Sequence, residues 1–171
     1  MNPEQAKAAA DVIASMWENE FRATCQVIGA VDTGNREYKP DAKSRSAWEI
    51  AKHIAQSDVW FLDCITNGVF QFDHEQAKKM DAQFTSIQDV LDFYQKTFPE
   101  KLKALRAVPA EKMAESLDFM GFMKMPRSSF VAFANNHSMH HRGQLAAYLR
   151  AMGSKVPDIY GPSADSERSA K

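Results

Sequence analysis

Three of the five histidines in the chain lie in one stretch, Asn136-His137-Ser138-Met139-His140-His141-Arg142-Gly143-Gln144. His137 and His141 are four residues apart, and on an α-helix this spacing places two side chains on the same face, one turn from each other. Two neutral imidazoles so placed can bind one divalent transition-metal ion. The stretch therefore predicts a helix that carries two ligands of a metal site.

The histidine stretch belongs to the last long helix that the sequence predicts, from about Ser128 to Gly153. Apolar residues recur at three- and four-residue steps on the side that carries His137 and His141, so both histidines are expected to face the core. Ser128 or Ser129 can cap the start of this helix, and Gly153 is a typical residue just beyond a helix end.

A third metal ligand must come from another element, and His53 is the best candidate. It lies in the first half of a second predicted helix, from about Ser46 to Asn67, which ends before Gly68. Ser46 and Glu49 have the spacing of a capping box at the start of this helix. The sequence thus predicts a three-histidine site, His53, His137 and His141, between two helices.

His140 offers an alternative ligand because it lies three residues after His137. At 100° per residue, His140 is turned about 60° from the His137 direction and His141 only about 40°. We therefore prefer His141 and expect His140 to flank the site or to support a ligand. Three neighbouring side chains can also hydrogen-bond to the ligands: Asn136, Arg142 and Gln144.

Three neutral imidazoles suit Zn, Ni, Fe or Cu better than Mg or Ca, and Zn or Ni is the leading expectation, with Fe as an alternative. Three protein ligands leave a coordination position open for water or substrate, whereas a structural zinc site typically has four. Glu49 lies one turn before His53 and is the candidate to orient a ligand or act as a base. It can equally be only the capping partner of Ser46.

Two more long helices are predicted, from Pro3 to Val31 and from just after Thr85 to about Val108. Both show apolar residues at three- and four-residue steps. Thr85 and Gln88 have the spacing of a capping pair. Pro99 is expected to kink or interrupt the later helix.

The predicted connections are longer than the shortest helix–helix loops. Residues 32–44 and 69–83 are expected to be polar loops, the second with His74 as a surface histidine. Residues 109–112 can form a short turn of helix. The Phe- and Met-rich segment 117–126 is predicted to be an extended arm or hairpin that covers the core, lines a pocket or meets a partner chain.

These elements predict an all-α protein, a four-helix bundle formed by a single domain over residues 1–171. The long loops leave a simple up-down-up-down order unassured. Residues from about 163 to 171 are expected to form a disordered tail.

The composition excludes several classes of protein. A net charge of −1 and a pI near 6.5 argue against a protein that binds nucleic-acid backbones. No apolar run reaches the roughly 18 residues of a membrane span, and the first residues lack the pattern of a signal peptide, so a cytoplasmic location is expected. Cys25 and Cys64 fall in predicted helices and are expected to be small apolar core residues rather than a reactive thiol or a disulfide.

The chain resembles the DinB/YfiT-like superfamily of bacterial four-helix-bundle proteins over nearly its whole length. The resemblance rests on the His53 helix, the His-Ser-Met-His-His-Arg-Gly-Gln-Leu segment at 137–145, and the closing residues 149–153 and 156–161. It implies a metal held by His53, His137 and His141, and frequent homodimers. It also implies, for members with known chemistry, thiol transferases or isomerases that use low-molecular-weight thiols such as bacillithiol or mycothiol.

Three functional hypotheses follow. The leading one is a metal-dependent thiol S-transferase-like enzyme that activates a small-molecule thiol against an electrophilic substrate. The second is a metal-dependent hydrolase that uses metal-bound hydroxide, with Glu49 as base. The third is a noncatalytic metal-binding stress protein in which the metal ties two helices together.

Overall fold

The computed structural model describes residues 1–31 and 33–166 and is mostly helical. Four long helices form a bundle, which confirms the all-α four-helix fold. They are α1 (Pro3–Gly29), α2 (Ala47–Asn67), α4 (Ile87–Arg106) and α6 (Arg127–Ala151). The smaller elements are α3 (His74–Asp81), α5 (Ala110–Ala114) and an antiparallel hairpin of β1 (Ser116–Phe119) and β2 (Met123–Pro126).

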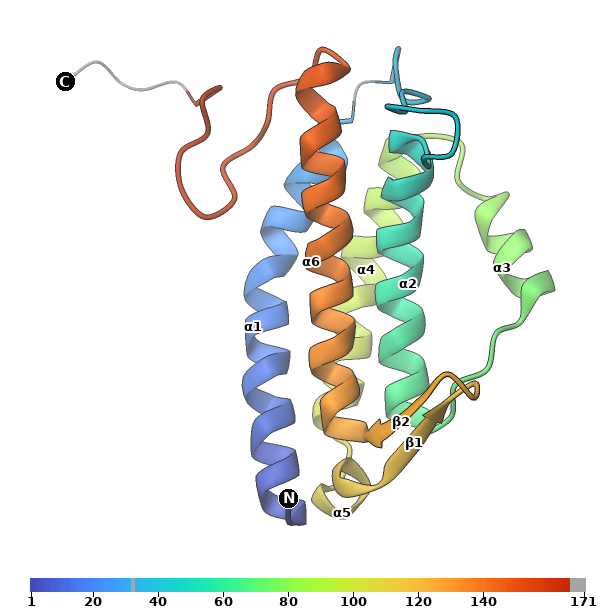
Figure 1. Ribbon diagram of the computed structural model, residues 1–171, viewed down its shortest axis with the longest axis vertical. Helices are drawn as coiled ribbons and strands as arrows, with labels where there is room; N and C mark the ends of the chain where they lie inside the picture. The colour runs from blue at the N-terminus through green and yellow to red at the C-terminus, as the bar shows by residue number, and fades with distance from the viewer. Residues whose placement is uncertain (32, 167–171) are drawn as a thin grey trace.

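The four helices do not alternate in direction. α1 and α6 run upward in Figure 1, whereas α2 and α4 both run downward. α2 packs against α4 and α6, and α1 packs against the same two helices, so α1 and α2 lie diagonally across the bundle. Because α2 and α4 are parallel, the chain between them must return along the full height of the bundle. The sequence left the order of the helices open, and the structure shows it to be up-down-down-up.

Three of the four long helices, α1, α2 and α4, begin where side chains satisfy free backbone N–H groups. Asn2 and Gln5 form a capping box at α1, and Ser46 and Glu49 form the one predicted at α2. The predicted cap of α4 was wrong by one residue. Ser86 and Asp89 form the box, and the Asp89 carboxylate also accepts from the Thr85 backbone.

The predicted start of the last helix, near Ser128, is confirmed to within one residue, but its predicted serine cap was wrong. α6 begins at Arg127 directly after the hairpin, and its N-cap is Pro126, which offers no side-chain cap. Ser128 is buried, and no hydrogen-bond partner for its Oγ lies within the described residues. The first predicted helix ends two residues early, at Gly29 rather than Val31.

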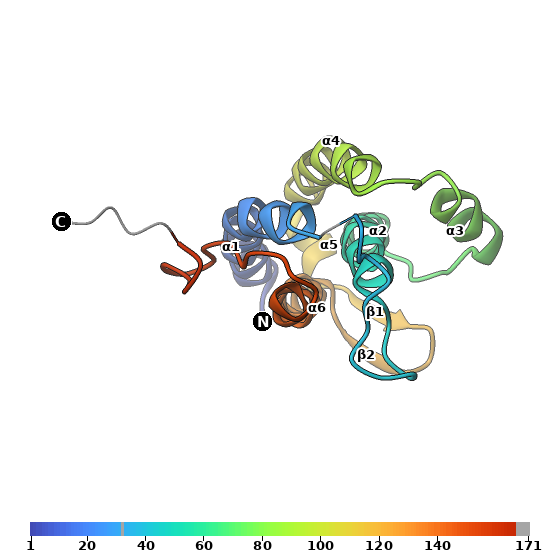
Figure 2. The same cartoon turned by 90° about the horizontal axis from the view of Figure 1, so that it is seen from above.

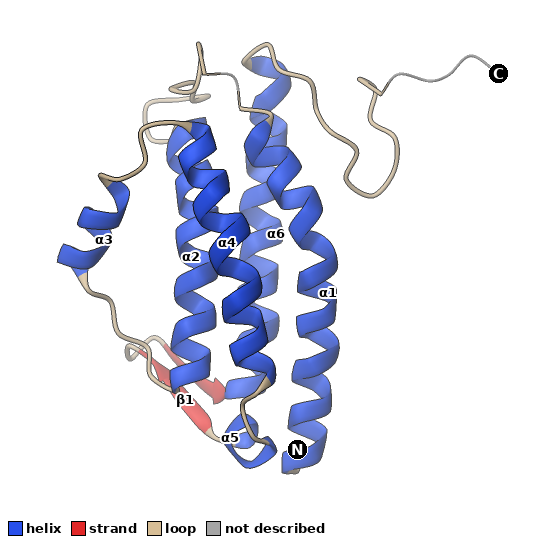
Figure 3. Cartoon of the chain, turned by 180° about the vertical axis from the view of Figure 1, so that it is seen from behind, coloured by secondary structure: helices blue, strands red, loops and turns tan. Residues whose placement is uncertain are grey.

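The connection between α2 and α4 is not the plain loop that was predicted. Residues 74–81 form α3, whose N-cap is Asp73, and none of its residues is buried. α3 stands away from the bundle (Figure 3). Because this helix has only two apolar residues, Ala77 and Met80, hydrophobic periodicity was too short a signal to reveal it.

The sequence predicted a kink or an interruption of α4 at Pro99, and the structure has no interruption there. The helix is continuous from Ile87 to Arg106. Phe98 and Leu102, on either side of the proline, are buried in the core. Their packing holds the helix together despite the one backbone hydrogen bond that proline cannot make.

The hairpin prediction for the Phe- and Met-rich segment is confirmed. Phe119 pairs with Met123 next to a turn in which Met120 and Gly121 have positive φ angles. Leu117 is buried and joins the core, whereas Phe122 at the tip is 80% exposed. The segment therefore covers one end of the bundle and also presents apolar side chains to solvent.

The C-terminal segment folds back beside α6. Asp165 accepts hydrogen bonds from Arg150 and from the Val156 backbone, and Ser163 donates to the Val156 carbonyl. The rest of the predicted disordered tail, residues 167–171, lies outside the described residues. Among the helices of the described ranges, none has the length and apolar character needed to span a bilayer.

Gly68 closes α2 in the left-handed conformation, with φ of 81°. An alanine Cβ there would also overlap the buried Arg127 guanidinium. We expect Gly68→Ala to lower the free energy of unfolding by more than the roughly 1–2 kcal/mol that positive φ costs a non-glycine residue. Urea unfolding measures this.

Gly153→Ala is the matched control. Gly153 also has a positive φ, 91°, but no atom of the described residues lies within 4 Å of the position of its Cβ. An equal loss of stability in the two variants would show that displacement of Arg127 costs nothing.

Candidate metal centre

The three predicted histidines meet between α2 and α6. His53 extends from α2, and His137 and His141 extend from successive turns of α6. The Nε2 atoms of His53 and His137 are 3.3 Å apart. One ring nitrogen from each of the three histidines lies within 4.8 Å of the others. The three rings are arranged edge to face, with centroids 4.5–5.1 Å apart.

The surroundings keep these imidazoles neutral at pH 7. Burial lowers the pKa of His53 to about 3 and that of His137 to about 4, and the positive charge of Arg45 and the neighbouring histidines add to the effect. Burial also lowers the pKa of His141, although its hydrogen bond to Gln144 acts in the opposite direction. Neutral rings carry the lone pairs that a metal requires.

Gln144 fixes the tautomer of His141. Its Oε1 atom lies 3.0 Å from Nδ1 of His141, and its Nε2 donates to the Tyr148 hydroxyl. Because a carbonyl oxygen can only accept, Nδ1 of His141 must carry the proton. The other nitrogen, Nε2, is therefore left with its lone pair free for a metal.

The donor set fits a transition-metal ion. With metal–nitrogen bonds of 2.0–2.1 Å and tetrahedral angles, two ligand nitrogens are about 3.3 Å apart, which is the separation of the His53 and His137 Nε2 atoms. Nδ1 of His137 is buried, and no group of the described chain hydrogen-bonds to it. Nε2 of His137 faces Nε2 of His53, which is its only hydrogen-bonding neighbour among the described residues.

The other candidates near the site have different positions. His140 is exposed, and its ring contacts only that of His141 among the three histidines. Asn136 is exposed as well. Glu49 is exposed, and its carboxylate accepts a 2.7 Å hydrogen bond from the Ser46 backbone. This geometry supports the capping role for Glu49 and gives no support to its role as a base.

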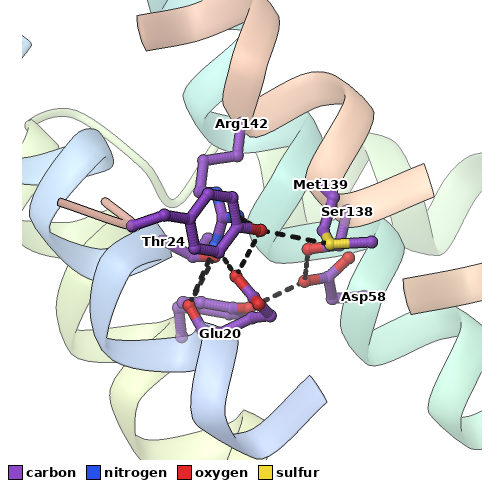
Figure 4. A network of polar contacts seen from close by, with 8 residues as sticks. Glu20, Thr24, Asp58, Ser138, Met139 and Arg142 are labelled. Carbon is purple, nitrogen blue, oxygen red and sulfur yellow. Dashed lines mark hydrogen bonds and ion pairs between the residues drawn. The ribbon is translucent and has the colours of Figure 1, made fainter. Parts of the chain in front are cut away.

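Arg142 does not support the histidines, contrary to one expectation from the sequence. It points to the other side of α6, toward α1 (Figure 4). There it forms an ion pair with Glu20 at 2.5 Å and donates to the Tyr160 hydroxyl at 2.6 Å. The pair is mostly buried and joins α6, α1 and the C-terminal segment, so the role of Arg142 is structural.

A cavity of about 720 Å³ opens beside the histidines. His53 and His137 form part of its wall. Much of the remainder is apolar, with Trp60 and Phe61 from α2, Phe119 from the hairpin and Phe72 from the segment before α3. A small molecule in this cavity can therefore reach the side of the histidine group.

Sequence analysis missed two charged residues near the site. Asp58 is fully buried and accepts hydrogen bonds from Tyr94 and Ser138, each 2.7 Å long (Figure 4). It lies four residues from both Ile54 and Leu62 on the buried stripe of α2, and this spacing could have predicted that Asp58 is buried. Arg45 lies in a loop, where periodicity gives no signal.

Comparison with known proteins identifies the family. A model of the DinB family matches residues 4–169. The chain belongs to the DinB family. It is 27% identical over 148 residues to YrdA of Bacillus subtilis, an uncharacterized protein, with 86% of this chain and 85% of YrdA covered. This membership confirms the resemblance that the sequence suggested.

Solved DinB-like structures share the fold. A crystal structure of YjoA from Bacillus subtilis has a TM-score of 0.67 at 24% identity and covers 88% of this chain and 99% of that one. A DinB-like protein from Bacillus cereus has a TM-score of 0.70 at 23% identity, with 86% and 95% covered.

Gln144 provides a test of metal binding that leaves all three histidines of this DinB protein intact. We expect Gln144→Leu to weaken metal affinity by about 10- to 100-fold, because the acceptor that orients His141 is lost. Competition with chelators of graded affinity measures the change. Asn136→Ala is the control on the same helix, and an equal effect of both substitutions would contradict the role of Gln144.

Proposed function

We propose that this DinB-family protein is a metal-dependent enzyme of the thiol S-transferase type that uses a low-molecular-weight thiol. The observation that supports it most is a group of three neutral imidazoles, two of which, His53 and His137, line a cavity of about 720 Å³. Three histidines leave a coordination position for an exchangeable ligand, whereas a structural zinc typically has four protein ligands.

The protein residues prepare the site for such a reaction. His53, His137 and His141 would hold the ion, and Gln144 orients His141. When bound, the metal would lower the pKa of a thiol and stabilise its thiolate. The aromatic side chains of Trp60, Phe61 and Phe119 exclude water from the cavity wall, which favours a desolvated and therefore more reactive sulfur.

A conjugation assay tests the proposal. The protein is reconstituted with Zn, Ni or Fe and incubated with bacillithiol, glutathione or coenzyme A and an aryl halide. Transfer forms a sulfur–carbon bond, releases the halide and passes the thiol proton to solvent. We expect metal-dependent conjugate, detected by mass spectrometry, that is lost in His53→Ala and retained in His140→Ala. The same rate with and without metal, for every thiol, would refute the proposal.

A further inference from the structure

The wall of the cavity beside the histidines is a preformed aromatic surface. The Trp60 ring lies 4.9 Å from that of Phe61 and 6.0 Å from those of Phe72 and Phe119. Trp60 Nε1 donates to the Gln71 carbonyl at 2.9 Å, which fixes the orientation of the indole. Flat apolar molecules bind well to such rigid aromatic walls.

The aromatic surface extends directly to the histidines. The Phe61 ring lies 5.2 Å from that of His137 and stacks nearly parallel to Phe119. Phe61 is 4% exposed and therefore rigidly packed. A flat compound on this wall would thus have one end close to the three imidazoles.

A positive charge lies beside the histidines of the cavity wall. Arg45 lines the cavity, and its charge contributes to the lowered pKa values of His53, His137 and His141. Arg45 is exposed, and no carboxylate of the described ranges forms an ion pair with it. Lys101, the other cation of the wall, is paired with Asp63 at 2.8 Å, and the second carboxylate of the wall, Asp73, accepts from the Gln76 backbone at the start of α3. The unpaired cation therefore lies beside the histidines.

We propose that the cavity binds an organic anion with a flat, aromatic body, which lies against Trp60 and Phe72 while its anionic group lies between Arg45 and the histidines. The proposal rests on the proposed function in treating this compound as the electrophilic substrate. The binding itself requires only the cavity wall and Arg45, and the metal adds a second positive charge at the histidines.

A matched pair of ligands tests the charge preference. Naphthoate and naphthamide share one ring system and differ in charge, and calorimetry measures the binding of each to the full-length protein. The protein is used as purified and again after chelator treatment. We expect naphthoate to bind about three- to fivefold more tightly than naphthamide, as one solvent-accessible ion pair provides. Acetate, which has no flat body, should not bind measurably.

Two substitutions assign the two parts of the site. In the chelator-treated protein, Arg45→Gln should abolish the preference for naphthoate and leave naphthamide binding unchanged, and Lys43→Gln is its control in the same loop, outside the cavity wall. Phe72→Ala should weaken both compounds by about fivefold through loss of an aromatic contact. Phe122→Ala is the control for Phe72, because Phe122 is exposed at the hairpin tip and does not line the cavity.

The outcomes separate this inference from the proposed function. Equal binding of the two compounds, no binding at millimolar concentration, or equal effects of a substitution and its control would overturn it. Selective naphthoate binding by a protein that retains no metal would support the cavity assignment and refute the proposed function. Metal-dependent conjugation without any preference for naphthoate would support the proposed function and refute the cavity assignment.

Discussion

Metal retention is expected to disappear when His53, His137 or His141 is replaced by alanine and to persist in His140→Ala. Each of the three residues contributes one nitrogen to a group whose donor atoms lie within 4.8 Å of one another. Loss of one leaves two protein ligands, and the affinity should fall by more than the roughly 100-fold that loss of an outer hydrogen-bond partner can cost. Elemental analysis after gel filtration measures the metal, expected at about one ion per chain in the wild type.

His140→Ala is a demanding control because His140 is the immediate neighbour of His141 and its ring contacts that of His141. A nonspecific histidine-rich surface would lose metal in all four variants to a similar extent. Circular dichroism verifies that each variant remains helical, which is expected because the three ligands are only partly buried. Metal content in His137→Ala equal to that of the wild type, or no uptake by the wild type after reconstitution, would contradict the site.

The sequence predicts this site well because its main information is local. The four-residue spacing of His137 and His141 determines their common face on any helix, and the apolar stripe of α6 determines which face is inward. The position of His53 required one more inference, that its helix packs on the last one, and the structure has that contact. Arg142 shows that a residue next to a ligand in the sequence need not lie in the site. Arg142 follows His141 by one residue, which corresponds to a rotation of 100° about the helix axis. Its guanidinium therefore points toward Glu20 on α1.

Features that depend on tertiary structure could not be predicted in the same way. α3 has eight residues, of which only Ala77 and Met80 are apolar, and this is too few for hydrophobic periodicity to predict a helix. Arg45 reaches the cavity from a loop, and its place depends on how the long connection from α1 crosses to the diagonal helix α2. Asp58 is different. Its position on a buried stripe was visible in the sequence, but its partners Tyr94 and Ser138 come from two other helices.

Asp58 leads to the second prediction, on stability against pH. Burial raises the pKa of this carboxyl group to about 7, although hydrogen bonds from Tyr94 and Ser138 lower it. Oδ1 has no hydrogen-bond partner in the described parts of the chain. The folded pKa lies above the unfolded value of about 3.9, so the folded state keeps a proton that the unfolded state releases. The resulting stabilisation is full below pH 4 and is lost as the pH rises through 7.

Asp58→Asn removes this titration and keeps the shape of the side chain. Between pH 5 and pH 8 the wild type should lose about 2–3 kcal/mol of unfolding free energy through Asp58, at 1.36 kcal/mol for each pKa unit. The stability of Asp58→Asn relative to the wild type should therefore rise by that amount over the same range. Urea unfolding of both proteins in the presence of chelator measures the difference, and the histidine contributions cancel because both proteins contain them.

Two further variants establish that the effect comes from burial. Asp63→Asn changes a partly exposed carboxylate of the same helix, paired with Lys101, and should show no comparable dependence on pH. Tyr94→Phe removes a hydrogen bond that stabilises the Asp58 carboxylate, so its loss of stability should be larger at pH 8 than at pH 5. A constant difference between Asp58→Asn and the wild type from pH 5 to pH 8 would mean that Asp58 is ionised throughout. The two hydroxyl donors would then outweigh the cost of burying its charge.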